Sequence, residues 1–235
     1  MVNKHYEQAG VAMTCRSFTE YELMFALDKE RLQEGPILDV ASGASSFSAE
    51  AAAKGYRSQA ADPLYSMDAE AIREHGEREI ELSTRKLDAI KDVYDWSYYG
   101  DLDRHRAMRE QSLQRFIEDF KRHEGSDKYT AARLPELPFD NDSFSLVLCS
   151  HFLFLYQEQF DEAFHLQAVR ELLRVCRQGG RVLIYPLYSL RWERYPALDS
   201  MLAELSSEGI TVETGVSHLA FIPESTEFLI LKKSS

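Results

Sequence analysis

The chain has 235 residues, 44% of them hydrophobic, and a formal net charge of −12. Its length and apolar content suit one large domain with a real core, and its acidity excludes a general binder of phosphate backbones, which needs clustered Lys and Arg. The three cysteines are too far apart to share a metal ion, so we expect buried thiols and no metal site. No segment has the pattern of a signal peptide or a transmembrane helix, so we expect a cytoplasmic protein without membrane contact.

The N-terminal region, residues 1–34, contains a predicted helix that begins near Arg16. Ser17 or Thr19 is placed to cap it. Two interpretations stay open for this helix. It covers one edge of a sheet, or it places Arg16 and Tyr21 over a bound ligand.

A strand, a loop of small residues and a helix follow the Gly-Pro turn signal at 35–36. The strand is the apolar run 37–40, and the loop is 41–46. This arrangement aims backbone N–H groups and a helix N-terminus at one point, where small side chains let a nucleotide-like ligand approach. The next strand ends at Asp62, and an acid in that place accepts hydrogen bonds from ribose hydroxyls.

A long charged region, residues 67–127, separates the second strand from the third. Its composition and apolar spacing predict helices over 69–90 and 104–123. An aromatic stretch, 94–100, lies between them. Its rings either pack on the main domain or line a substrate pocket under a helical cap.

The third predicted strand ends before Arg133 and Leu134, and the fourth, an apolar run over 146–149, ends at Ser150 and His151. Ligands of open α/β sheets bind at the carboxyl ends of the strands. His151 is therefore the best general-base candidate in the chain. The alternatives are a histidine that hydrogen-bonds locally or one that stacks on a cofactor.

The remaining elements alternate in the same way. We expect a helix over 162–176 that a Gly179-Gly180 turn ends, a strand over 181–186, a helix over 195–208, and two final strands. The final strands span 210–216 and 226–232. Alternation of strands and helices over nearly the whole chain predicts an α/β fold.

Several of these segments resemble motifs of class I S-adenosylmethionine-dependent methyltransferases that act on small molecules. The matching segments are 38–45, 61–63, 137–151 and the Gly179-Gly180 turn. Gly43 matches the middle glycine of the family's first loop, whereas Ala41 and Ser45 stand where that loop usually has glycines.

The resemblance implies a three-layer α/β fold with a doubly wound, mostly parallel seven-stranded sheet and an antiparallel hairpin at its C-terminal edge. It implies a single domain over 1–235, with an N-terminal cover helix within about 1–34 and a helical insertion of about 67–127.

It also implies a methyltransferase that uses S-adenosylmethionine and a small-molecule acceptor, with no nucleic-acid partner. Arg16 is then expected to bind the methionine carboxylate, and Asp62 the ribose. The implied cofactor-binding residues are Arg16, Asp39, Ala41, Ser42, Gly43, Asp62, Pro63, Arg133, Leu134 and Ser150. The implied substrate-binding residues are Tyr94, Trp96, Tyr98, Tyr99 and His151, of which His151 is also the catalytic candidate.

Two alternative functions stay open at this point. One is an S-adenosylmethionine-binding protein without catalysis, and the other is a nicotinamide-dependent oxidoreductase. The sequence does not identify the methyl acceptor, the attacking atom or the oligomeric state.

Overall fold

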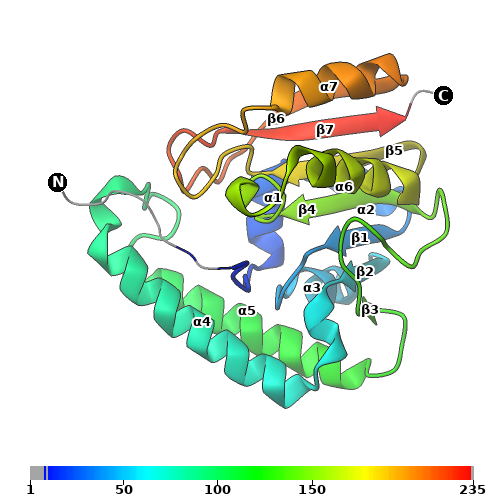
Figure 1. The fold of residues 1–235 in the computed structure, drawn as a ribbon. Coiled ribbons are helices and arrows are strands. Elements are labelled where there is room, and N and C mark those ends of the chain that lie inside the picture. The colour runs from blue at the N-terminus through cyan, green and yellow to red at the C-terminus, as the bar shows by residue number, and fades with distance from the viewer. Residues whose placement is uncertain (1–7, 9, 234–235) are drawn as a thin grey trace.

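The computed structural model describes residues 8 and 10–233, which form a mixed sheet with helices on both faces (Figure 1). Its seven strands lie in the order β3-β2-β1-β4-β5-β7-β6. Neighbouring strands from β3 to β5 are parallel, and β7 is antiparallel to both β5 and β6. This confirms the predicted sheet and its antiparallel edge hairpin. The strands are β1 (Ile37–Val40), β2 (Ser58–Ala61), β3 (Tyr129–Thr130), β4 (Phe144–Ser150), β5 (Cys176–Tyr185), β6 (Ile210–Val216) and β7 (Glu227–Lys233).

Helices cover both faces of the central strands, so β1 and β4 are buried along their whole length. This is why both strands are mostly apolar along their length and do not alternate between apolar and polar residues. The core on one face holds α6 and α7, and the core on the other holds α1 and α3. The α-helices are α1 (Phe18–Phe25), α2 (Lys29–Gln33), α3 (Phe47–Ala53), α4 (Ala69–Ala89), α5 (Leu102–Arg122), α6 (Glu162–Val175) and α7 (Leu198–Ser207). Short 3-10 turns are η1 (Pro63–Ser66), η2 (Lys91–Val93) and η3 (Gln157–Gln159).

Helix α1 begins with a capping box between Ser17 and Glu20. The Ser17 hydroxyl accepts a hydrogen bond from the Glu20 N–H, and the Glu20 carboxylate accepts one from the Ser17 N–H at 2.8 Å. Ser17 is therefore the cap, and Thr19 is not. The pair satisfies two N–H groups that a helix start otherwise leaves unpaired.

The insertion is a hairpin of the two long helices α4 and α5, which lies beside the β3 end of the sheet (Figure 1). The helices cross closely at Gly76, where an added Cβ would lie 2.7 Å from the Leu113 side chain. Asp119 of α5 joins the hairpin to the sheet, because its carboxylate accepts hydrogen bonds from Lys128 Nζ at 2.5 Å and Tyr129 Oη at 2.7 Å. None of the described helices is long and apolar enough to cross a membrane.

The predicted Gly179-Gly180 turn is wrong as a helix end. Helix α6 ends at Val175, and β5 begins at the next residue. The register between β4 and β5 shifts there, so that Phe144 pairs with Cys176 but Leu146 pairs with Arg181. The glycines therefore lie in a bulge of the strand, where a Cβ at Gly180 would be 2.8 Å from the Ser145 carbonyl oxygen.

Candidate active site

The loop after β1 is held by the carboxylate of Asp62 at the end of β2. Asp62 Oδ2 accepts a hydrogen bond from the Gly43 N–H at 2.9 Å, and Oδ1 accepts one from the Leu64 N–H at 2.9 Å. Burial raises the pKa of Asp62, while these two N–H groups act against the rise. Ala41 has φ +55°, the left-handed conformation that glycine adopts without cost. The position thus keeps a glycine's backbone shape with an alanine side chain.

Two of the predicted cofactor residues, Asp39 of β1 and Ser42 of the loop, make contacts that hold this loop. Asp39 is buried, and its carboxylate accepts a hydrogen bond from Tyr21 Oη at 3.0 Å. Burial raises the pKa of Asp39 well above its ordinary value. Ser42 Oγ is 2.6 Å from Tyr65 Oη. Both side chains support the loop rather than face the cavity above it.

A cavity of about 340 Å³, here called cavity A, opens at the carboxyl ends of β1, β2 and β4. Several of its walls are apolar, including Leu64, Phe152 and Phe160. The predicted site residues that line it are Ala41, Gly43, Asp62, Pro63, Arg133, Leu134 and His151. The structure therefore brings together residues as far apart in the sequence as Ala41 and His151.

A second cavity of about 140 Å³, cavity B, lies between the insertion and the sheet. Tyr94 and His105 contribute from the insertion, Tyr185 from β5, and Phe221 from the segment between β6 and β7. His151 lines both cavities, as do residues 12–14. The two cavities are therefore neighbours at the end of β4, where they share His151 as a wall residue.

His151 has φ +53°, which is uncommon for a residue with a side chain. Such strained residues at the ends of strands often belong to functional sites. Its Nδ1 is 2.8 Å from Ser150 Oγ. Burial and the positive charges of Arg16 and Arg109 lower its pKa well below 6.5, so the ring is neutral at neutral pH.

The N-terminal segment, residues 11–16, crosses directly over Gly43. The Ala44 N–H donates to the Thr14 carbonyl at 3.1 Å, and the Ser46 N–H donates to the Arg16 carbonyl at 3.0 Å. A Cβ on Gly43 would lie 2.8 Å from the Thr14 carbonyl oxygen. The close approach that Gly43 permits in this structure is that of the chain's own backbone.

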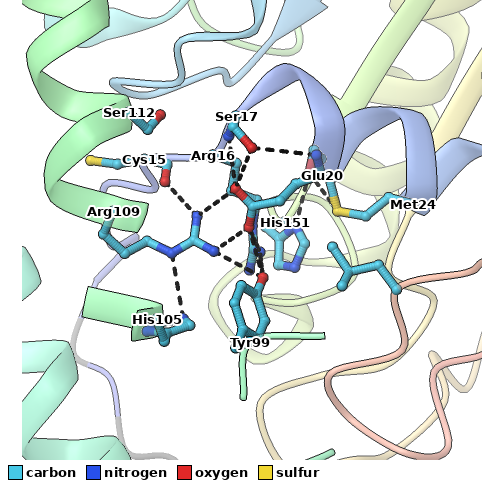
Figure 2. A network of polar contacts seen from close by, with 12 residues as sticks. Cys15, Arg16, Ser17, Glu20, Met24, Tyr99, His105, Arg109, Ser112 and His151 are labelled. Atoms are coloured by element: carbon cyan, nitrogen blue, oxygen red, sulfur yellow. Dashed lines mark hydrogen bonds and ion pairs between the residues drawn. The ribbon is translucent and has the colours of Figure 1, made fainter. Parts of the chain in front are cut away.

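A buried charge cluster lies beside cavity B and consists of Arg16, Glu20, Tyr99, His105 and Arg109 (Figure 2). Glu20 pairs with Arg109 and with Arg16 Nη1, the latter at 3.2 Å, and accepts a hydrogen bond from Tyr99 Oη at 2.7 Å. Burial alone would raise the pKa of Glu20, but the charges of Arg109 and Arg16 outweigh it and lower the pKa to about 2. Glu20 is therefore ionised and balances one of two buried guanidinium charges.

The other predicted substrate residues differ in their surroundings. Tyr94 lines cavity B. Trp96 packs edge-on against Phe221, and its Nε1 donates to the Lys91 carbonyl at 2.6 Å. Tyr98 packs edge-on against Tyr99, which belongs to the charge cluster. Part of the aromatic stretch therefore packs on other aromatic residues, and Tyr94 lines a cavity whose use for substrate stays a prediction.

Sequence reasoning missed three site residues: Glu20, His105 and Arg109. The spacing of Ser17 and Glu20 marks a capping box, which explains a glutamate but not its burial. His105 and Arg109 are one turn apart on α5, a spacing common on helix surfaces. Arg16, predicted near the cofactor, lines cavity B rather than cavity A.

Comparisons with known proteins show which family the chain belongs to. A family model described as a methyltransferase domain matches residues 96–184, from the insertion to β5. The chain is 34% identical over 190 residues to the uncharacterized protein MJ0045 of Methanocaldococcus jannaschii, an alignment that covers 80% of this chain and 83% of that protein.

Solved structures also resemble the chain at low identity. A S-adenosylmethionine-dependent methyltransferase from Methanosarcina mazei is 15% identical with a TM-score of 0.48, over 88% of this chain and 96% of that one. The N-methyltransferase NodS from Bradyrhizobium japonicum is 13% identical with a TM-score of 0.46, over 86% of this chain and 79% of that one.

The protein belongs to the class I S-adenosylmethionine-dependent methyltransferases, in one family with the Methanocaldococcus jannaschii protein. S-adenosylmethionine is the methyl donor of this class. The match to a methyltransferase domain favours this class over the nicotinamide-dependent alternative.

Proposed function

We propose that the protein transfers a methyl group to a small-molecule acceptor, with the methyl donor in cavity A and the acceptor in cavity B. The observation that carries the proposal is that both cavities are lined by His151, at the carboxyl end of β4. Ligands of open α/β sheets bind at these strand ends. Ligands in two neighbouring cavities of this kind are held close to each other and out of bulk water.

The residues of cavity A fit the adenosine part of the donor. Each carboxylate oxygen of Asp62 accepts one backbone N–H and keeps acceptor capacity for a ribose hydroxyl. Leu134, Phe152 and Phe164 supply apolar surface suited to a flat base. Pro63 and Arg133 complete this wall.

When bound, S-adenosylmethionine supplies a methyl group that is activated by its neutral thioether leaving group. The chain's own residues then hold the acceptor in line and exclude water. His151 also has a defined way to hold a proton. Ser150 Oγ lies 2.8 Å from His151 Nδ1 and 3.8 Å from Met24 Sδ, a weak acceptor. In the tautomer in which the hydroxyl donates to the sulfur and accepts from Nδ1, Nε2 is unprotonated and takes a proton from an acceptor that must lose one.

The experiment that tests the proposal measures ligand binding by thermal shift and calorimetry. We expect S-adenosylhomocysteine to bind and raise the melting temperature, and NADH to have no effect. The Asp62→Asn variant should bind S-adenosylhomocysteine at least about tenfold more weakly. Asparagine has one neutral acceptor oxygen in place of two charged ones, so it cannot accept from both backbone N–H groups and from a ribose hydroxyl.

The matched control is Asp68→Asn, because Asp68 is an exposed helix cap and asparagine caps a helix equally well. Its affinity should equal that of the unaltered protein. Stabilisation by NADH alone, or an unchanged affinity in Asp62→Asn, would contradict the assignment of cavity A.

A further inference from the structure

Two buried N–H groups beside cavity B have no hydrogen-bond partner among the described residues. They are Arg16 Nε and His105 Nδ1. His105 is 5% exposed, and the Arg16 side chain is 12% exposed. Buried polar groups are nearly always paired, so two unpaired ones at the same cavity indicate a partner from outside the chain, which is either ordered water or a ligand that displaces it.

Both atoms are hydrogen-bond donors. Arg109 Nε donates to His105 Nε2 at 3.4 Å, so Nε2 is the unprotonated nitrogen and Nδ1 carries the hydrogen. Burial and the charges of Arg109 and Arg16 lower the pKa of His105 to about 2, which keeps the ring neutral. Arginine has no acceptor atom. A ligand at this place must therefore present hydrogen-bond acceptors.

The charge cluster carries a net positive charge. Arg16 and Arg109 are cations, and Glu20 is its only carboxylate. Glu79 acts electrostatically on Cys15 and Tyr156, but it is partly exposed and does not line cavity B. Buried charge without a counter-charge is costly, so a ligand with one negative charge is favoured over a neutral one.

The rest of cavity B is mostly apolar, with Thr14, Ser83 and His151 as its polar wall residues, and the cavity is small. Leu87, Leu155 and Leu190 line it together with the aromatic residues Tyr94, Tyr156 and Phe221. Its volume of about 140 Å³ is close to that of apolar cavities that bind benzene. The cavity thus suits a single ring or a short branched chain.

We infer that the methyl acceptor is a small apolar carboxylic acid whose carboxylate accepts hydrogen bonds from Arg16 Nε and His105 Nδ1. This inference rests on the proposed function, because it takes cavity B as the acceptor site. The competing source of a carboxylate is the methionine part of the donor. Arg16, His105 and Phe221 line cavity B and not cavity A, which favours the acceptor.

The test uses benzoate, its neutral isostere benzamide and S-adenosylhomocysteine as probes, with calorimetry on the full chain. We expect benzoate to bind at least about tenfold more tightly than benzamide, since hydrogen bonds to charged groups are strong. Benzoate should bind equally well with S-adenosylhomocysteine present.

Two variants of His105 separate recognition from packing. His105→Phe keeps an aromatic ring but removes the donor, and it should bind benzoate about tenfold more weakly. His105→Asn keeps an N–H near the position of Nδ1 and should retain the affinity for benzoate. Neither variant should change the affinity for S-adenosylhomocysteine, because His105 does not line cavity A.

Equal binding of benzoate and benzamide, or no binding of either, would overturn the inference. Competition between benzoate and S-adenosylhomocysteine would also overturn it, because the N–H groups of Arg16 and His105 would then bind the carboxylate of the methionine part of the methyl donor. Failure of S-adenosylhomocysteine to bind contradicts the proposed function instead, whatever benzoate does. The two proposals therefore fail separately.

Discussion

At the scale of single residues, Glu20 has two tasks. It completes the capping box of α1, and it is the anion that compensates Arg109 and Arg16 in a buried site. Removing one partner of a buried ion pair leaves the other charge without compensation, which costs far more than the pair contributes. The stability of this region should therefore depend strongly on one carboxylate.

We predict that Glu20→Gln lowers the free energy of unfolding by about 3–5 kcal/mol, because it leaves two buried guanidinium groups with no anion. Urea unfolding at neutral pH measures the change. The matched control is Glu22→Gln on the same helix, a half-buried residue outside the charge cluster, and it should stay within about 0.5 kcal/mol. A similar loss in both variants would show that Glu20 is not the counter-charge of the cluster.

Some site residues could be predicted from the sequence because their position follows from the elements. Asp62 and His151 each follow a buried strand, and the ends of parallel strands meet at one edge of the sheet. Arg109 could not be predicted in this way. Its partner Glu20 is 89 positions away, and the pair depends on how the insertion packs against α1.

At the scale of elements, the N-terminal segment is joined to the loop after β1 by backbone hydrogen bonds from Ala44 and Ser46. Gly43 lies under it with no room for a side chain. The segment also contributes to the walls of both cavities. Its position should therefore decide whether the two cavities keep their shape.

We predict that Gly43→Ala displaces this segment. The added methyl group would collide with the Thr14 carbonyl oxygen, so the amides of Ala44 and Ser46 should exchange their hydrogens faster than in the unaltered protein. Backbone strain and collision together should cost about 2–4 kcal/mol. Hydrogen exchange and urea unfolding measure these effects.

Gly125→Ala is the matched control for that variant. Gly125 has φ +75°, close to the +57° of Gly43, but no atom lies within 4 Å of an added Cβ. It should show only the backbone strain of about 1–2 kcal/mol and unchanged exchange at Ala44. If Gly43→Ala behaves like this control, the segment does not rest on Gly43.

The elements themselves were largely predictable, because strands buried on both faces are short apolar runs and the helices carry one apolar face. The Gly179-Gly180 pair shows where this stops. Paired glycines indicate a place without room for side chains, but a turn after a helix and a bulge in a strand both satisfy that condition. Only the pairing with β4 distinguishes them.

At the scale of the whole molecule, the layered fold follows from the alternation of strands and helices. The place of the insertion does not. It depends on the close crossing at Gly76 and on Asp119, which receives hydrogen bonds from the start of the third strand. These contacts join residues whose sequence neighbourhoods look like ordinary solvated helix.

The buried neutral His105 predicts how the stability of the whole molecule depends on pH. Its pKa is about 2 in the folded protein and about 6.5 in the unfolded chain, so below pH 6.5 only the unfolded chain takes up the proton. The free energy of unfolding should therefore fall by about 1.4 kcal/mol per pH unit for this group as the pH drops below 6.5. His151, whose pKa is also lowered, adds in the same direction, and Glu20 adds only below about pH 4.5.

Urea unfolding of the protein and of His105→Phe between pH 7.5 and 5 measures the share of His105. The groups around His105 are Arg109 on its own helix and Arg16 and Glu20 from the N-terminal region, and all three keep their charge over this range. As the pH falls, the free energy of unfolding of the variant should decrease less steeply than that of the unaltered protein, by about 1.4 kcal/mol per pH unit. This holds even if the variant is less stable at every pH. An unchanged slope would mean that His105 takes up a proton in the folded protein. A protonated ring carries a hydrogen on both nitrogens, so Nε2 could not accept from Arg109 and the assigned tautomer would be wrong.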